Sequence, residues 1–173
     1  ILFVFPNTND PGYKLVGVST LSALAKKAGH QTALFDTSFM DTSKFAKVKN
    51  FKAGMENTNN GIGEKTLNFK PIADKSVHNK RKVDLKSTFL SQLILFKPDL
   101  VAISCLSTEW YLSQLILNYT KEHDPSIFTI VGGRHCVADP EGTIAHPNVD
   151  AICVGEGELA FMRLLETLEK GTI

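Results

Sequence analysis

The stretch "LVAISCLSTEW" (100–110) begins as a buried β-strand and ends as a polar loop. Its apolar run closes at Ser104, and Ser107 follows at a place where an ordinary turn needs no hydroxyl side chain. The next apolar run, residues 127–131, leads in the same way into "GGRHC" (132–136). Continuous apolar runs of this length are typical of strands buried on both faces of a parallel sheet. Small and polar residues are therefore expected at one edge of such a sheet.

Strand and helix patterns alternate on both sides of this stretch, which indicates an α/β fold. Five strands separated by helices favour a flavodoxin-like (Rossmann-like) doubly wound parallel sheet of order 2-1-3-4-5, forming a single domain over residues 1–173. The other strands are predicted at residues 1–5, 31–36 and 150–154, and helices at about 15–28, 85–96, 112–124 and 157–169, with a short helical segment at about 139–145.

A long polar segment, residues 37–84, interrupts the alternation after the second strand. It is rich in Lys, Asn, Thr and Ser. Connections of this length are uncommon within compact domains and are either functional lids or mobile loops. We expect an insertion here, and both alternatives stay open.

Composition limits the classes of partner. Lys and Arg number 19 against 18 Asp and Glu, so the net charge of +1 gives no electrostatic reason to expect a nucleic acid or an anionic membrane. No apolar run approaches the roughly 20 residues of a membrane span. The three cysteines are widely spaced and predict neither a disulfide framework nor a CxxC metal site, which favours a cytoplasmic location. Because the sequence starts inside a strand without Met, we expect it to be part of a longer chain.

The loops after the strands weaken the case for several functions that are common in this fold. A dinucleotide requires GxGxxG after the first strand, but only Gly12 and Gly17 occur there. The loop "PNTNDPG" (6–12) is a poor version of a flavin phosphate loop, and Ser104 stands where a receiver domain carries Asp. The remaining pattern is a hydroxyl at the end of the third strand and paired glycines at the end of the fourth.

That pattern resembles a known family. Ser104-x-Leu106 followed by Gly132-Gly133 is similar to the S-x-L…GG signature of cobalamin-binding domains. "FPNTNDPGYKLVG" (5–17), "FKPDLVAISCLS" (96–107) and "VGGRHCVADPEGTIAHPNVDAICVGEGE" (131–158) resemble the N-terminal domain of cobalamin-dependent radical SAM proteins, over essentially the whole chain except the insertion. The resemblance implies that Ser104 hydrogen-bonds the benzimidazole and that the bare glycines leave room for the nucleotide tail.

The resemblance also implies what this chain lacks. Asp10 is followed by Pro11 and Gly12 instead of the D-x-H-x-x-G motif, so no first-loop His is available to ligate cobalt, and we predict no metal-ligating or catalytic residue. The chain contains no CxxxCxxC motif. An iron–sulfur cluster, S-adenosylmethionine and a small-molecule substrate are therefore expected only with a downstream radical SAM domain of the same polypeptide. The implied cobalamin-binding residues are Asn7, Pro11, Gly12, Ser104, Leu106, Ser107, Gly132, Gly133, His135, Gly155 and Glu156.

Simpler roles stand beside these. Ser107 suits a helix N-cap, the paired glycines a tight turn, and Glu156 the start of a helix. Cys105 is expected to be a buried structural thiol, and Trp110 to pack on the corrin or on the insertion. Two other functions also remain: a degenerate Rossmann-like scaffolding or interaction domain that binds no corrin, and a flavodoxin-like flavin-binding domain.

Overall fold

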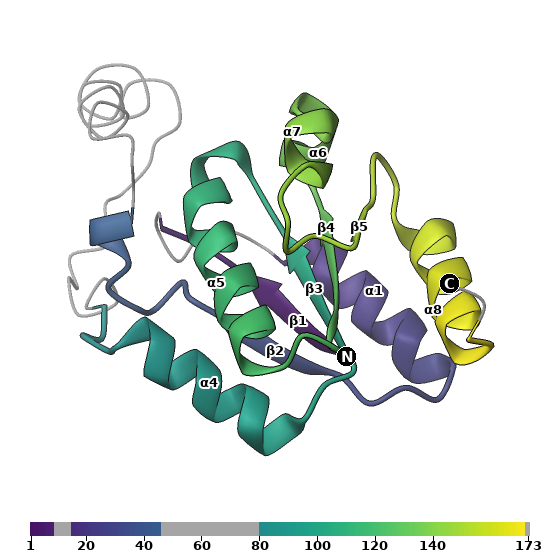
Figure 1. Ribbon diagram of the computed structural model, residues 1–173, viewed down its shortest axis with the longest axis horizontal. Coiled ribbons are helices and arrows are strands. Elements are labelled where there is room, and N and C mark those ends of the chain that lie inside the picture. Colours follow the sequence, from purple (N-terminus) through teal and green to yellow (C-terminus); the bar gives the residue numbers. More distant parts are fainter. Residues whose placement is uncertain (9–14, 46–79, 172–173) are drawn as a thin grey trace, which may run out of the picture.

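The computed structural model describes residues 1–8, 15–45 and 80–171 (Figure 1). Its centre is a parallel sheet of five strands in the order β2-β1-β3-β4-β5, which confirms the predicted doubly wound fold. The strands are β1 (Leu2–Phe5), β2 (Ala33–Asp36), β3 (Leu100–Ser104), β4 (Phe128–Gly132) and β5 (Ala151–Ile152).

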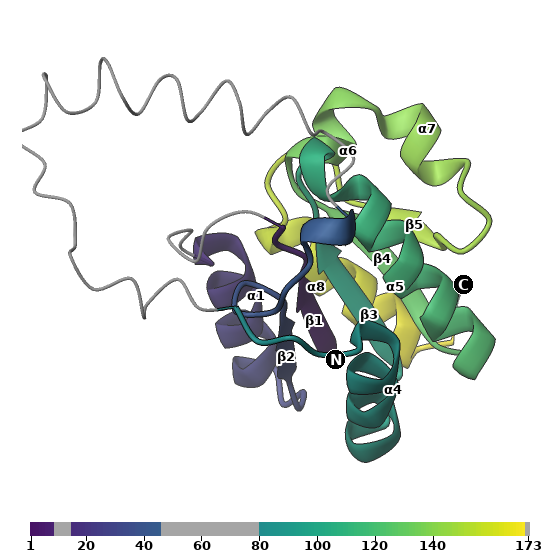
Figure 2. The ribbon, with the colours of Figure 1, turned by 90° about the vertical axis from the view of Figure 1, so that its left-hand side faces the viewer.

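Helices cover both faces of the sheet. One face packs against α1 (Val16–Lys27) and α8 (Glu158–Glu169), and the other against α4 (Leu85–Phe96) and α5 (Trp110–His123) (Figures 1 and 2). Short helices follow the carboxyl ends of the strands, namely η1 (Ser43–Phe45), η4 (Ser107–Glu109), α6 (Arg134–Ala138) and α7 (Pro140–Ile144). None of the helices within the described ranges is both long and apolar enough to cross a bilayer.

The sheet separates two hydrophobic cores because successive strand side chains point to opposite faces. Leu2 and Val4 belong to the core under α4 and α5, whereas Phe3 belongs to the core under α1 and α8. Aromatic pairs join sheet to helix on each face: the rings of Phe3 and Phe161 lie 5.7 Å apart, and those of Phe35 and Phe89 lie 5.0 Å apart. The apolar runs in the sequence are continuous because both faces are covered.

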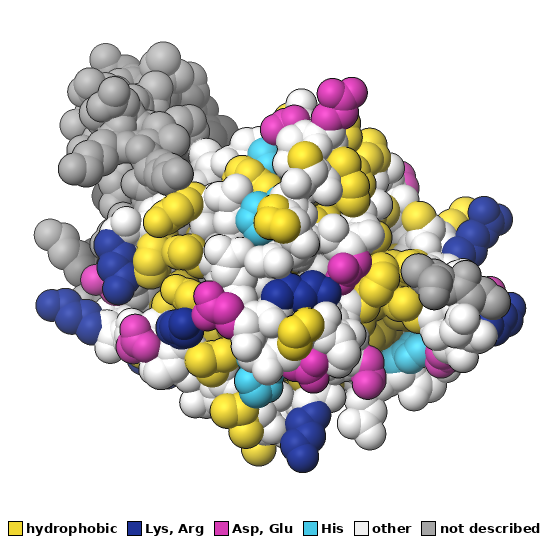
Figure 3. All heavy atoms as spheres, in the orientation of Figure 1, with side chains coloured by type: hydrophobic (Ala, Val, Ile, Leu, Met, Phe, Trp, Pro, Cys, Tyr) yellow, Lys and Arg dark blue, Asp and Glu magenta, His cyan; other side chains and the backbone are white. Residues whose placement is uncertain are grey.

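Charged side chains of both signs are mixed on one face of the molecule. On the face shown in Figure 3, acidic and basic side chains of the described residues are interspersed among hydrophobic ones. This distribution accompanies a net charge of +1.

A strand and a short helix are among the elements that differ from the sequence prediction. The fifth strand was expected over 150–154, but only Ala151 and Ile152 pair with β4. The helix α6 was not expected, because the glycine pair before it suggested a loop; the predicted segment at 139–145 corresponds to α7. Asp139 caps α7 by accepting a hydrogen bond from the Gly142 main-chain N–H at 3.0 Å.

The two ends of the long polar segment lie beside each other. Thr37, Ser38 and Thr42 are buried, and a parallel β-bridge joins Met40 to Arg81. Residues 46–79 lie outside the described part of the chain, so whether this segment acts as a lid stays open.

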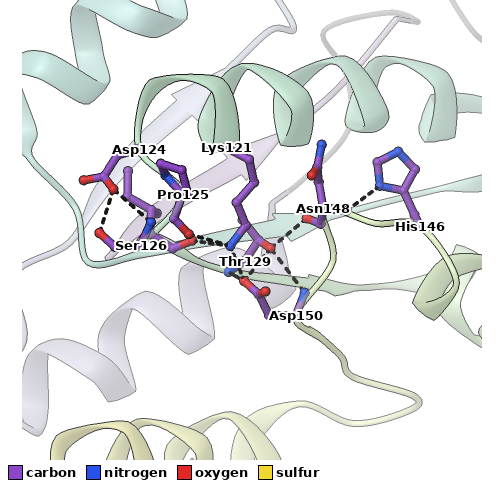
Figure 4. A network of polar contacts seen from close by, with 9 residues as sticks. Lys121, Asp124, Pro125, Ser126, Thr129, His146, Asn148 and Asp150 are labelled. Carbon is purple, nitrogen blue, oxygen red and sulfur yellow. Dashed lines mark hydrogen bonds and ion pairs between the residues drawn. The ribbon is translucent and has the colours of Figure 1, made fainter.

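A network of polar side chains lies next to the start of the short strand β5. Asp150 accepts hydrogen bonds from Lys121 Nζ at 2.6 Å and from the Thr129 main-chain N–H at 2.7 Å, and Thr129 Oγ1 donates to the Asn148 carbonyl at 2.8 Å (Figure 4). Burial opposes ionisation of Asp150, but the hydrogen bonds from Lys121 and Thr129 outweigh it and lower the pKa of this carboxyl. The network therefore ties α5 to the first residues of β4 and β5.

We expect Asp150→Ala to lower the free energy of unfolding by about 1–3 kcal/mol, because it leaves Lys121 and the Thr129 N–H without their acceptor. The folded-state pKa is depressed, so this contribution is present at neutral pH and is lost as the pH falls through that pKa. Urea denaturation at neutral and acidic pH measures both effects, with the exposed α8 variant Glu166→Ala as the control. Equal stability of the two variants at neutral pH would contradict the assigned role.

Candidate functional site

A cavity of about 180 Å³ opens at the carboxyl edge of the sheet, on the face covered by α1 and α8. Strand residues form its floor, the two helices form its walls, and glycine-rich loops form its rim. Its lining consists of Phe3, Gly17, Val18, Leu21, Ala102, Ile103, Ser104, Ile130, Gly132, Gly133, Cys153, Gly155, Glu156, Gly157, Glu158 and Phe161.

The structure brings five of the predicted cobalamin-binding residues into this lining: Ser104, Gly132, Gly133, Gly155 and Glu156. These residues follow three different strands, as expected for a site at the carboxyl ends of a parallel sheet.

The other predicted residues lie elsewhere. Leu106, Ser107 and His135 belong to the same loops but are not in the lining, and neither is Asn7. Pro11 and Gly12 lie outside the described residues. Direct cobalamin contact by these residues stays a prediction.

Ser104 offers a polar group at the mouth of the cavity. It is the last residue of β3 and pairs in register with Gly132 of β4. Its hydroxyl has no hydrogen-bond partner within the described ranges, although the side chain is only partly exposed. A hydroxyl can both donate and accept, so Ser104 is able to fix a polar atom of a ligand.

The paired glycines serve different purposes. A Cβ on Gly132 would lie 3.6 Å from Cys153 Cβ, an ordinary van der Waals distance, so its missing side chain leaves free space in the cavity. Gly133 has φ 96° and ψ −172°, a conformation almost restricted to glycine. A Cβ there would lie 2.6 Å from the Cys105 carbonyl oxygen. Gly133 thus permits backbone contact, whereas Gly132 leaves room for a ligand.

Main-chain hydrogen bonds fix the loops after β3 and β4 to each other. The Cys105 N–H donates to the Gly132 carbonyl at 2.8 Å, and the His135 N–H donates to the Cys105 carbonyl at 3.1 Å. Cys105 is buried, as expected, and burial raises the pKa of its thiol to about 12 even though Ser113 Oγ donates to the sulfur. This thiol is therefore protonated and structural.

His135 packs on the opposite side of the same loops. Its Nδ1 lies 3.1 Å from Ser107 Oγ, and its ring lies 4.7 Å from that of Trp110, which also contacts His146 at 5.8 Å. Burial lowers the pKa of His135 against the opposing effect of Asp139, so the ring is neutral at pH 7. Its Nε2 is buried and has no hydrogen-bond partner among the residues described. In this arrangement Trp110 packs on two imidazoles.

Asn7 is buried beside β2. Its Nδ2 donates to Ser38 Oγ at 2.9 Å, and its main-chain N–H donates to Thr37 Oγ1 at 2.7 Å. These contacts anchor the loop after β1 to the residues that follow β2.

Several lining residues were not identified from the sequence. Ala102 and Ile130 precede Ser104 and Gly132 by two positions, so strand alternation alone places them on the same face, and this signal was available. Leu21 and Phe161 come from helices whose rotation the sequence does not fix. A Cβ on Gly157 would lie 3.5 Å from a Leu21 methyl group, so the two helices approach closely here.

Metal-ligating groups are sparse in the described part of the chain. No three His, Cys, Asp or Glu side chains are grouped there so as to hold a metal ion. The cavity itself presents mainly apolar groups, glycine backbone and the Ser104 hydroxyl, a lining suited to a largely apolar organic group with a few polar atoms.

Comparison with protein families identifies the domain to which this fold belongs. The family model described as the B12 binding domain matches residues 72–165, which is more than half of the chain. The chain belongs to the B12-binding domain family. This membership confirms the predicted resemblance and favours cobalamin over flavin as the ligand of this B12-binding domain.

Curated relatives of the B12-binding domain are much longer proteins. An uncharacterized methyltransferase of Pyrococcus horikoshii, PH0819, is 33% identical over 90 residues, covering 51% of this chain and 20% of its own length. The cobalamin-dependent radical SAM methyltransferase TokK of Streptomyces tokunonensis is 36% identical over 75 residues, covering 42% and 11%. The anaerobic magnesium-protoporphyrin IX monomethyl ester cyclase of Rubrivivax gelatinosus is 31% identical over 87 residues, covering 46% and 15%. No solved structure matches significantly.

The two glycines should respond differently to substitution. We expect Gly133→Ala to destabilise the domain by about 1–3 kcal/mol, because alanine is strained at this backbone conformation and its methyl group meets the Cys105 carbonyl. Gly132→Ala, the matched control, should be tolerated. Thermal denaturation distinguishes the variants, and equal melting temperatures would contradict the assigned constraint.

Proposed function

We propose that this B12-binding domain holds cobalamin within a larger cobalamin-dependent radical SAM enzyme, with the nucleotide tail in the cavity below Ser104 and Gly132. The observation that carries the proposal is the cavity itself: a bare glycine and a hydroxyl without a partner among the described residues face it from adjacent strands, in a chain of this family.

The cavity suits the aromatic end of the tail in size and chemistry. Its volume is about 180 Å³. An apolar protein cavity of roughly 150 Å³ is sufficient to bind benzene. Ala102, Ile130 and Phe161 supply apolar surface, and Ser104 supplies a single hydroxyl at the mouth. A flat aromatic ring system with one polar edge meets these conditions.

The roles that we propose for the described lining residues are in binding and not in bond making. Ser104 would hydrogen-bond the benzimidazole, Gly132 would leave its path open, and Gly155 and Glu156 would border the entrance. When bound, cobalamin supplies the group-transfer chemistry of its cobalt, while the protein supplies orientation and shielding. The domain alone is therefore expected to bind without catalysing.

The relatives indicate which further domain the whole enzyme would contain. TokK is a cobalamin-dependent radical SAM methyltransferase, and the Rubrivivax protein is a cyclase. This chain spans only 11–20% of the three relatives described above. We propose that a radical SAM domain of the same polypeptide carries the iron–sulfur cluster, S-adenosylmethionine and the small-molecule substrate, for methyl transfer or ring formation. The free thiols of Cys105, Cys136 and Cys153 favour a cytoplasmic location.

The direct test is uptake of cobalamin by the chain. Mixed with hydroxocobalamin and desalted, the protein should retain corrin absorption of base-off character, because the tail would occupy the cavity instead of the cobalt. Trp110, the single tryptophan, lies at the same sheet edge and should report binding by loss of fluorescence. A colourless protein with unchanged fluorescence would contradict the proposal and favour a scaffolding domain.

A cavity-filling variant locates the tail. Gly132→Val should weaken cobalamin binding by at least about tenfold, or ~1.4 kcal/mol, because its side chain would occupy the cavity. The strand should tolerate valine, so melting temperature should be preserved. Val137→Leu adds bulk at an exposed position of α6 outside the cavity and serves as the control. Unchanged affinity of Gly132→Val would place the tail elsewhere.

A second pair of variants tests the hydroxyl. Ser104→Ala removes one hydrogen bond to the ligand and should cost about 0.5–1.5 kcal/mol of binding energy, or roughly 2- to 13-fold in affinity. Ser107→Ala, in the same loop but outside the cavity, should bind nearly as wild type. Fluorescence titration measures both, and the reverse order of effects would assign the polar contact to Ser107.

A further inference from the structure

A buried carboxylate lies behind the Ser104 loop. Glu109, the last residue of η4, is only 2% exposed. Its Oε2 accepts a hydrogen bond from the Thr8 main-chain N–H at 3.1 Å, and its Oε1 accepts one from Thr108 Oγ1 at 3.4 Å. Burial raises the pKa of Glu109, while these hydrogen bonds and the charge of Lys80 oppose the shift. Ionising a buried acid costs free energy unless hydrogen bonds or opposite charges offset the loss of hydration. A carboxyl group is therefore unusual at this buried position.

The Glu109–Thr8 hydrogen bond crosses the crevice where this fold binds ligands. Thr8 follows β1 and Glu109 follows β3, and these two strands are neighbours in the sheet. The order β2-β1-β3-β4-β5 reverses direction between them, and such a switch point opens a crevice at the carboxyl edge. One carboxylate therefore links the loops on both sides of the crevice.

Thr8 is held from a second direction. Lys80 Nζ donates to the Thr8 carbonyl at 3.3 Å, so the two sides of one residue's backbone meet a carboxylate and an ammonium group. The preceding residue, Asn7, is bound to Thr37 and Ser38. Three segments that are far apart in the sequence thus converge on the loop that leaves β1.

We propose that Glu109 is a positioning residue for cobalamin binding, which fixes the loop after β1 (Pro6–Thr8) to the segment that follows Ser104 at the end of β3. The backbone next to Ser104 and the end of β1 are then fixed before the ligand binds, and binding does not have to order them. Glu109 itself lies outside the cavity lining and acts through Thr8. This inference rests on the proposed cobalamin-binding function.

Two isosteric variants separate positioning from stability. Glu109→Gln retains an oxygen acceptor for the Thr8 N–H, whereas Glu109→Met keeps the shape and removes the acceptor. Glu109→Met leaves the buried Thr8 N–H without its acceptor, so we expect a lower melting temperature. Asp150→Ala, which removes an acceptor outside the cavity lining, is the control for reduced stability and should bind cobalamin as the wild type does. Cobalamin affinity should be near wild type in the Gln variant and about tenfold weaker in the Met variant. Glu166→Met, at an exposed site on α8, is the control.

Exchange of the Thr8 amide hydrogen, followed by NMR without ligand, tests the contact independently of cobalamin. The amide should be protected in the wild type and in Glu109→Gln and unprotected in Glu109→Met. If the wild type binds cobalamin and Glu109→Met loses protection but keeps full affinity, the positioning role is overturned while the proposed function stands. If affinity merely follows melting temperature across the variants, the role is structural and the inference is also overturned. If the wild type fails to bind, the proposed function fails and the positioning role fails with it.

Discussion

The close contact between the loops after β3 and β4 is the constraint on which the site depends. Gly133 adopts a conformation that other residues avoid, and this brings its backbone against that of Cys105. The main chains of Cys105, Gly132 and His135 are then hydrogen-bonded to one another. As a result Ser104 and Gly132 end their strands at the same level and face one cavity. The cavity is thus a product of backbone geometry more than of side-chain chemistry.

Most of the fold could be predicted because burial on both faces leaves an unbroken apolar signal in each strand. The failures have local causes. The apolar run around β5 continues to Val154, but its registered pairing with β4 ends at Ile152 and its last main-chain hydrogen bond to β4 comes from Cys153. The helix α6 was missed because two glycines precede it, and glycine gives no indication that a helix starts immediately afterwards. Hydrophobic periodicity reports burial and not hydrogen-bond partners.

The lining of the cavity was predicted only where a sequence motif marked its residues. Ser104 and Gly132 were recognised from a motif and line the cavity. Ser107 and His135 belong to the same motif regions, but helices begin there and turn these side chains toward Trp110. Glu109 was overlooked because its partner, the Thr8 N–H, is a main-chain group 101 residues away. A linear pattern contains no information on such a contact.

The place of β1 between β2 and β3 has a consequence for biosynthesis. β1 ends at Phe5, but β3, which covers its second edge, begins only at Leu100. At roughly 5–20 residues per second, a ribosome needs on the order of 5–20 s to make the intervening chain. Throughout that time one side of an apolar strand has no partner, and exposed strand edges promote aggregation. The nascent chain therefore passes through a vulnerable interval that ends only when β3 emerges and joins β1.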